Sequence, residues 1–145
     1  MDLLLDVMVG GVRSHLRMCG HDAAYALDRG VEDDDRLLAL AREEGRTLVT
    51  RDAVLARRAD DAVLLETTDA AEQLRELDAA GVDLTLADDP GRCGACNGPL
   101  ERAEPPTPAY APDPEEERTW RCTDCGQCFW KGSHWERVAE TLGSL

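Results

Sequence analysis

The sequence contains a single lysine and a single phenylalanine, and it has no long apolar run. Its 16 basic residues are therefore almost all arginine, whereas Asp and Glu number 30 and give a net charge of −14. The acids are spread along the whole chain. An acidic, lysine-poor surface is typical of proteins in molar salt, where the Debye length falls to ~3 Å and self-repulsion is screened. The alternative interpretation is an acidic protein that avoids nucleic acid.

Because it has no long apolar run, the sequence predicts no membrane-spanning helix. The first apolar run, Leu3 to Leu5, is bounded by Asp2 and Asp6. A spanning helix requires about 18 or more consecutive apolar residues, and no segment approaches that length. No signal-peptide pattern is present either. We therefore expect a soluble, cytoplasmic protein without a membrane partner.

Five of the six cysteines lie near the C-terminal end in CxxC pairs. In a reducing compartment such pairs bind metal more often than they form disulfides. Two CxxC turns, or knuckles, surround one ion with four sulfur ligands, and this closed shell makes the metal structural. The sequence thus predicts a zinc ribbon, with the ligands Cys93, Cys96, Cys122 and Cys125.

Cys128 complicates this prediction because it forms another CxxC pair with Cys125. We favour Cys122 and Cys125 as ligands, since their spacing mirrors the first pair. Cys128 then packs as a small apolar side chain beside Phe129. A disulfide pair, a redox dithiol and a rubredoxin-type iron site are the alternatives for the four cysteines.

Strand and helix patterns alternate along the first 90 residues. Residues 3–7, 22–27, 47–50 and 62–66 are predicted strands. Predicted helices cover residues 9–19, the segment from the Asp33–Asp35 cluster to Gly45, residues 51–59, and a segment capped by Asp69. This alternation predicts an α/β fold with a mostly parallel sheet over residues 1–90.

The remaining residues, 91–145, are predicted to form a separate small zinc ribbon. The segment 99–118 holds six of the seven prolines, and we expect a loop or a partly disordered insertion there. Helical spacing of Trp135, Val138 and Leu142 predicts a C-terminal helix.

Two aspartates are placed where a parallel sheet binds ligands. Asp6 ends the first predicted strand, and Asp52 follows the strand 47–50 directly. Ligands of open α/β sheets bind beyond the carboxyl ends of the strands. Together with Asp34 at a helix start, these acids are candidates for a Mg²⁺ or Mn²⁺ site that acts on phosphodiesters. The alternative for Asp34 and Asp52 is an ordinary helix N-cap, whereas Asp69 is predicted to be a cap, with a peripheral metal role as its alternative.

The chain resembles the Mut7-C ribonuclease family, a PIN-like domain fused to a zinc ribbon. The matching segments are LLLDVMVGGVRSHLRMCGHDAAY (3–25), DDRLLALAREEGRTLVTRD (34–52), GRCGACNGPL (91–100) and RCTDCGQCFWKGSHW (121–135). The resemblance implies a three-layer PIN-like domain and metal-dependent RNA cleavage. It assigns catalytic, metal-binding roles to Asp6, Asp34 and Asp52, with Asp35 as the register neighbour of Asp34.

Arginines near these acids are candidates for binding RNA. Arg13 and Arg17 lie four residues apart on the first predicted helix, and Arg51 precedes Asp52. Arginine pairs bidentately with phosphate, so these residues are predicted to hold the RNA backbone. The alternative for each is a surface ion pair.

The second CxxC pair is surrounded by aromatic residues. Trp120, Trp130 and Trp135 either cover the ribbon, which has little other core, or stack on bases. His134 is a candidate for phosphate contact, with a structural hydrogen bond as the alternative. The predicted function is a divalent-metal-dependent ribonuclease that hydrolyses RNA phosphodiester bonds. A non-catalytic RNA- or protein-binding module of the same fold is the alternative.

Overall fold

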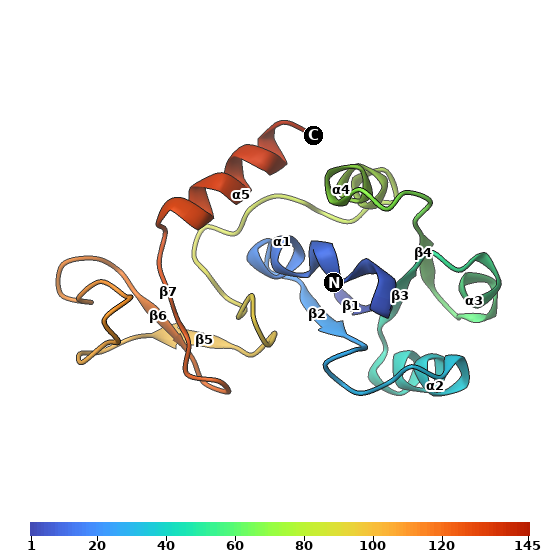
Figure 1. Ribbon diagram of the computed structural model, residues 1–145, viewed down its shortest axis with the longest axis horizontal. Coiled ribbons are helices and arrows are strands. Elements are labelled where there is room, and N and C mark those ends of the chain that lie inside the picture. Colours follow the sequence, from blue (N-terminus) through green and yellow to red (C-terminus); the bar gives the residue numbers. More distant parts are fainter.

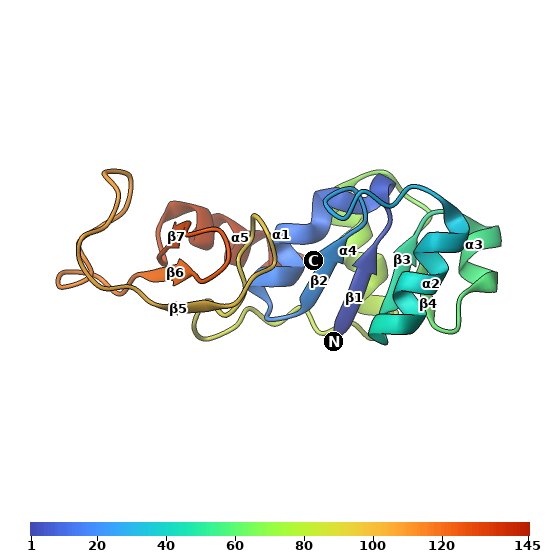
Figure 2. The same ribbon diagram turned by 90° about the horizontal axis from the view of Figure 1, so that it is seen from below.

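The computed structural model describes residues 1–145, and its larger sheet consists of four parallel strands in the order β2-β1-β3-β4. The strands are β1 (Asp2–Leu5), β2 (Asp22–Tyr25), β3 (Thr47–Thr50) and β4 (Ala62–Leu64). Helices lie on both faces of this sheet, as Figure 1 and Figure 2 show. The predicted α/β fold is therefore confirmed.

The strands and the helices alternate along the chain as predicted. The short 3₁₀ helix η1 (Val7–Val12) is followed by the α-helices α1 (Arg13–Met18), α2 (Asp34–Glu44), α3 (Ala53–Arg58), α4 (Ala70–Ala79) and α5 (Ser133–Gly143). Gly45 ends α2 in a left-handed conformation with φ 64°, which glycine adopts without steric cost. No helix has the length and apolar composition of a membrane span.

Three layers arise because successive strand residues point to opposite faces of the sheet. Leu3, Leu5 and Val49 pack in one apolar cluster with the helices α1 and α4. Leu4 and Leu48 point the other way, into a second cluster with α2 and α3. The sheet is thus buried on both faces, which is the usual state of parallel sheets.

The strand order reverses between β1 and β3. From β1 the chain first crosses to β2 on one side, and it later returns to place β3 and β4 on the other side. The loops after β1 and β3 therefore diverge at the carboxyl edge of the sheet. Crevices at such reversal points are where open α/β sheets bind ligands.

The predicted strand 3–7 and helix 9–19 have different boundaries in the structure. The strand ends at Leu5, because the Asp6 carboxylate accepts a hydrogen bond from the N–H of Val7 and begins η1. The helical segment is broken at Val9, whose φ of −117° is not helical, and regular α-helix starts only at Arg13.

The smaller sheet is antiparallel and follows the order β5-β6-β7. Its strands are β5 (Leu100–Arg102), β6 (Trp120–Cys122) and β7 (Cys128–Phe129). The prediction of a loop over 99–118 was wrong at its start, because Leu100–Arg102 pairs with β6. The insertion is also tied back to the ribbon where the Tyr110 hydroxyl accepts the N–H of Cys128 at 3.0 Å.

Helix α5 returns from the ribbon to the parallel sheet, above α1 in Figure 1. Leu142 and Leu145 pack against the apolar cluster formed by β1, β3, α1 and α4. The C-terminal residues thus complete the core of the N-terminal region. The domain boundary near Pro90 stays a prediction. The regions before and after Pro90 are in contact, because Leu142 and Leu145 pack against the N-terminal core.

The turn after β1 allows a sharp test of packing. A Cβ on Gly10 would lie 2.5 Å from the Tyr25 ring, whose hydroxyl is held by the carbonyl of Val7 at 2.8 Å. We expect Gly10→Ala to lower the free energy of unfolding by about 1–3 kcal/mol, the usual cost of overpacking. Urea unfolding would measure it.

Gly11→Ala is the matched control, because the nearest atom to a Cβ there is the methyl of Ala70 at 3.9 Å. Equal stability of the two variants would contradict the packing described for Gly10.

Candidate functional site

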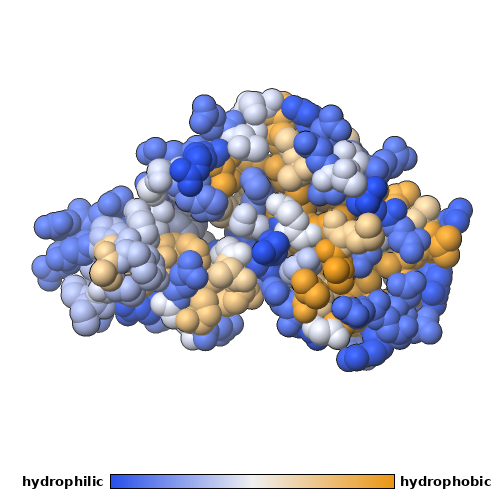
Figure 3. Space-filling model, in the orientation of Figure 1, coloured by the Kyte–Doolittle hydropathy of each residue, from blue (hydrophilic) through white to orange (hydrophobic).

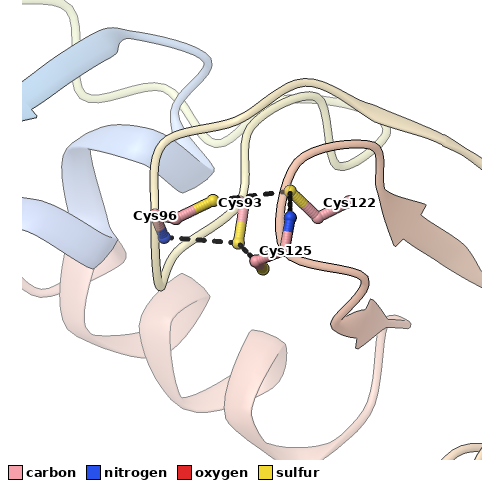
Figure 4. A group of neighbouring side chains, drawn as sticks. All are labelled: Cys93, Cys96, Cys122 and Cys125. Carbon is pink, nitrogen blue, oxygen red and sulfur yellow. Dashed lines mark hydrogen bonds between the residues drawn. The ribbon is translucent and has the colours of Figure 1, made fainter.

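The four predicted ligand cysteines converge at one point between the two knuckles (Figure 4). Their sulfur atoms all lie within 4.8 Å of one another. The Sγ atoms of Cys93 and Cys125 are 3.7 Å apart, and those of Cys96 and Cys122 are 3.5 Å apart. A disulfide would require about 2.0 Å, so these are free thiols.

The spacing fits a tetrahedral metal ion. With zinc–sulfur bonds of about 2.3 Å, neighbouring ligands in a tetrahedron are about 3.8 Å apart. The N–H groups of Cys96 and Cys125 also donate to the sulfurs of Cys93 and Cys122. Cys128 lies outside the group, buried on β7. The cluster can thus bind a structural metal such as zinc.

The first knuckle docks on the free edge of β2. In Ala23 both outward backbone groups are used: its N–H donates to the Asn97 side chain at 2.9 Å, and its carbonyl accepts Nε of Arg17 at 3.0 Å. Arg17 also donates to the carbonyl of Gly94 in the knuckle at 2.8 Å. These bonds cover an edge strand that would otherwise expose unpaired groups.

An ion-pair network reinforces this junction. The Asp22 carboxylate accepts Nδ2 of Asn97 and lies 2.8 Å from Arg46 and 3.5 Å from Arg92. Burial alone would raise the pKa of Asp22, but the hydrogen bonds from Arg46 and Asn97 outweigh it and lower this pKa. Asp22 is therefore held ionised at the point where the two regions meet.

The prediction that Arg17 binds RNA is corrected by this geometry. Its side chain is only 1% exposed, and its guanidinium is engaged with backbone carbonyls. It cannot reach a phosphate from there. Arg17 is instead a buried brace between α1, the edge of β2 and the first knuckle.

Asp6 and Asp52 lie on opposite sides of the strand reversal and are connected through Thr50. The Thr50 hydroxyl donates to Asp6 at 2.7 Å and accepts the backbone N–H of Asp52 at 3.1 Å. Asp52 is also the N-cap of α3 and accepts the N–H groups of Val54 and Leu55. Sequence reasoning missed the role of Thr50. Its position at the end of the predicted strand 47–50, two residues before Asp52, could have indicated that role.

The acids at the start of α2 have different partners. Asp33 is the N-cap, and Asp35 is paired with Arg58 on α3. Asp34 is exposed and makes no ion pair or side-chain hydrogen bond. Of Asp34 and Asp35, Asp34 is therefore the residue whose carboxylate is free to bind a metal ion. Asp69 caps α4 by accepting the N–H of Glu72, as predicted.

The acids do not form a compact cluster comparable to the cysteines. Among groups of three or more His, Cys, Asp or Glu side chains, only the four cysteines have ligand atoms all within 4.8 Å. Asp6, Asp34 and Asp52 therefore do not form a direct three-carboxylate shell around one ion.

The other predicted RNA ligands lie at two places. The exposed Arg13 donates to the carbonyl of Gly10 and lies over the Tyr25 ring, 5.2 Å from its centroid. Arg51 follows β3, and its Nε is buried without a hydrogen-bond partner. His134 is exposed in the first turn of α5, beside the ribbon.

A family model described as the Mut7-C RNAse domain matches residues 1–142. The chain belongs to the Mut7-C family. Comparison with curated proteins and with solved structures finds no match. The match covers both the parallel sheet and the ribbon of this Mut7-C domain, and it points to a ribonuclease-like function.

The protonation of the thiols shows what a metal must do in this Mut7-C domain. Burial, together with neighbouring thiols, raises the pKa of Cys96 to about 12. Burial also opposes ionisation of Cys122, but the N–H groups of Cys125 and Asp124 lower its pKa to about 7. Four thiolates thus require a cation, and with Zn²⁺ the cluster would carry a net charge of about −2 beside the buried Arg17.

Replacing Cys125 by Ser should abolish tight metal binding, because only three thiolates would remain. Cys128→Ala should bind a single metal ion per chain as the wild type does, since Cys128 lies outside the cluster. Cobalt titration, followed by thiolate charge-transfer absorption, would measure both. Loss of the ion in Cys128→Ala alone would contradict the ligand set.

Asn97→Ala should destabilise the docked knuckle by about 2–4 kcal/mol. It leaves the N–H of Ala23 unpaired and puts alanine at φ 72°. Asn97→Gly relieves the backbone strain but not the lost hydrogen bonds, so it should be intermediate. Urea unfolding of zinc-loaded protein would measure both; wild-type stability of Asn97→Ala would exclude this docking role.

Proposed function

We propose that this Mut7-C domain is a divalent-metal-dependent ribonuclease that hydrolyses RNA phosphodiester bonds. The observation that carries the proposal is the position of Asp6 and Asp52, which follow neighbouring strands at the reversal of strand order and are joined through Thr50. The family description supports the substrate class. Asp34 is the third acid of the proposed site.

The donor set suits Mg²⁺ or Mn²⁺. Oδ1 of Asp52 accepts two backbone N–H groups, which leaves Oδ2 free, and the Asp34 carboxylate is unengaged. Mg²⁺ keeps several waters and uses only one or two carboxylates directly, so it does not need a compact trio. When bound, such an ion neutralises negative charge and lowers the pKa of water.

The surrounding residues hold the two central carboxylates in place. Asp6 is fixed by the N–H of Val7 and by the Thr50 hydroxyl, which is fully buried. The N–H groups that begin α3 fix Asp52 in the same way. Donors held by the fold need no rearrangement when charge develops in the reaction.

Arginines at this edge would bind the RNA backbone. Arg51 has an unpartnered Nε next to Asp52, and Arg13 is exposed beyond η1. The apolar side chains of Met8, Leu27 and Val54 are also exposed just after β1, β2 and β3. Apolar surface interrupts the mainly hydrophilic face around the parallel sheet in Figure 3. We propose that phosphates pair with the arginines.

RNA cleavage with Mn²⁺ tests the proposal. Asp52→Asn keeps an oxygen that can accept both N–H groups, and Asn is as good a helix cap as Asp. Asp6→Asn keeps an oxygen for the N–H of Val7, and its amide NH2 replaces the second oxygen and can donate to the Thr50 hydroxyl. Both variants should therefore fold normally, yet they lose the charge that holds the cation. We expect cleavage to fall by roughly 100-fold or more, comparable to the loss of a ligand or of an essential electrostatic contact.

Asp78→Asn is the matched control, because Asp78 is exposed near the end of α4 and makes no ion pair. The assay should be run in both moderate and molar salt. Wild-type rates in both active-site variants would exclude the catalytic site. RNA binding without cleavage by any form would favour the non-catalytic binding module.

A further inference from the structure

A cavity of about 240 Å³ lies between α1 and the ribbon, away from the proposed catalytic acids. Its walls come from five separate segments: Ser14 on α1, Arg92 and Gly94 at the first knuckle, Tyr110 of the insertion, Trp130 after β7, and His134 at the start of α5. The volume is below the ~300–1,000 Å³ typical of drug-sized ligands, so it suits a single ring system.

The cavity lacks acidic residues. Asp and Glu make up 30 of the 145 residues, yet none of the 15 residues that line the cavity is acidic. Arg92 and His134 lie in its wall instead. In a chain of net charge −14, the wall itself thus presents no carboxylate to an anionic ligand, although Asp22 lies 3.5 Å from Arg92 outside the lining.

Aromatic rings form much of the wall. Tyr110 and Trp130 are stacked with ring centroids 6.3 Å apart, and the hydroxyl of Tyr110 is anchored to β7. The Trp130 indole lies against Gly132, where an added Cβ would be 2.5 Å from Nε1. Lys131 lies 5.7 Å from the centroid of the Trp135 ring. Fixed aromatic faces beside cations are what unpaired bases stack on.

We propose that this cavity binds one unpaired nucleotide of an RNA strand, with its base on the aromatic wall and its phosphate toward Arg92 and His134. The proposal rests on the proposed ribonuclease function for its choice of RNA. Helix α1 connects the cavity with the carboxyl edge of the sheet, because Ser14 lines the cavity and its neighbour Arg13 lies over Tyr25, the last residue of β2. Paired bases are not available for such stacking, so single strands are favoured.

Binding can be measured without cleavage in the intact, zinc-loaded Asp52→Asn protein. The probe is labelled oligoadenylate about ten nucleotides long, within the range that single-strand sites cover, with an RNA duplex of equal length for comparison. We expect the single strand to bind more tightly than the duplex. Trp130→Leu and Trp135→Leu should each weaken single-strand binding by roughly 5- to 150-fold, the range for a base that loses its aromatic partner.

A charge variant tests the same cavity without removing an aromatic ring. His134→Glu puts a carboxylate into the acid-free wall, at an exposed helix start where an acid is well tolerated. It should weaken oligoadenylate binding at least several-fold. Ala139→Glu adds the same charge to an exposed position of α5 outside the cavity, and it should bind as the parent does.

Unchanged affinity in His134→Glu and both tryptophan variants would overturn the proposal, as would equal binding of duplex or no binding to the parent. This outcome is separable from failure of the catalytic proposal. If wild-type protein never cleaves RNA but the cavity variants lose oligoadenylate binding, the nucleotide site stands and the nuclease does not.

Discussion

The docking of the first knuckle on the free edge of β2 is the constraint on which the rest of the molecule depends. Asn97 and Arg17 satisfy both outward backbone groups of Ala23, and Arg17 reaches on to the knuckle carbonyl of Gly94. The bonds fix the ribbon against the sheet, and this contact creates the cavity beside α1. It also places α5 so that Leu142 and Leu145 reach the core of the sheet.

This arrangement couples metal binding to the stability of the whole chain. The knuckle that presents Asn97 and Gly94 is shaped by Cys93 and Cys96, and the thiols can all ionise only around a cation. Free energy of metal binding is then free energy of folding. Arg17 is buried and makes no ion pair with a carboxylate, so the negative charge of a loaded cluster would add to the favourable charge that Asp28 supplies.

The two proposed RNA-contacting regions are the carboxyl edge of the parallel sheet and the cavity between α1 and the ribbon. The carboxyl edge holds Asp6 and Asp52 on a rigid sheet, where Thr50 connects them. The cavity beyond α1 offers aromatic faces and no acids. In a protein so negatively charged, we expect RNA to bind only where arginines and rings interrupt the acidic surface, and this would restrict the path that a strand can take.

Local patterns in the sequence determined the order of strands and helices, the end of α2 at Gly45, the cap of α4 at Asp69 and the four cysteines, because each depends on residues a few positions apart. Only tertiary structure decided that Leu100–Arg102 pairs with β6 and that Arg17 is a buried brace. Those outcomes depend on partners such as Cys122 and Gly94, which are distant in sequence. A side chain's spacing cannot reveal which remote backbone group will meet it in the folded chain.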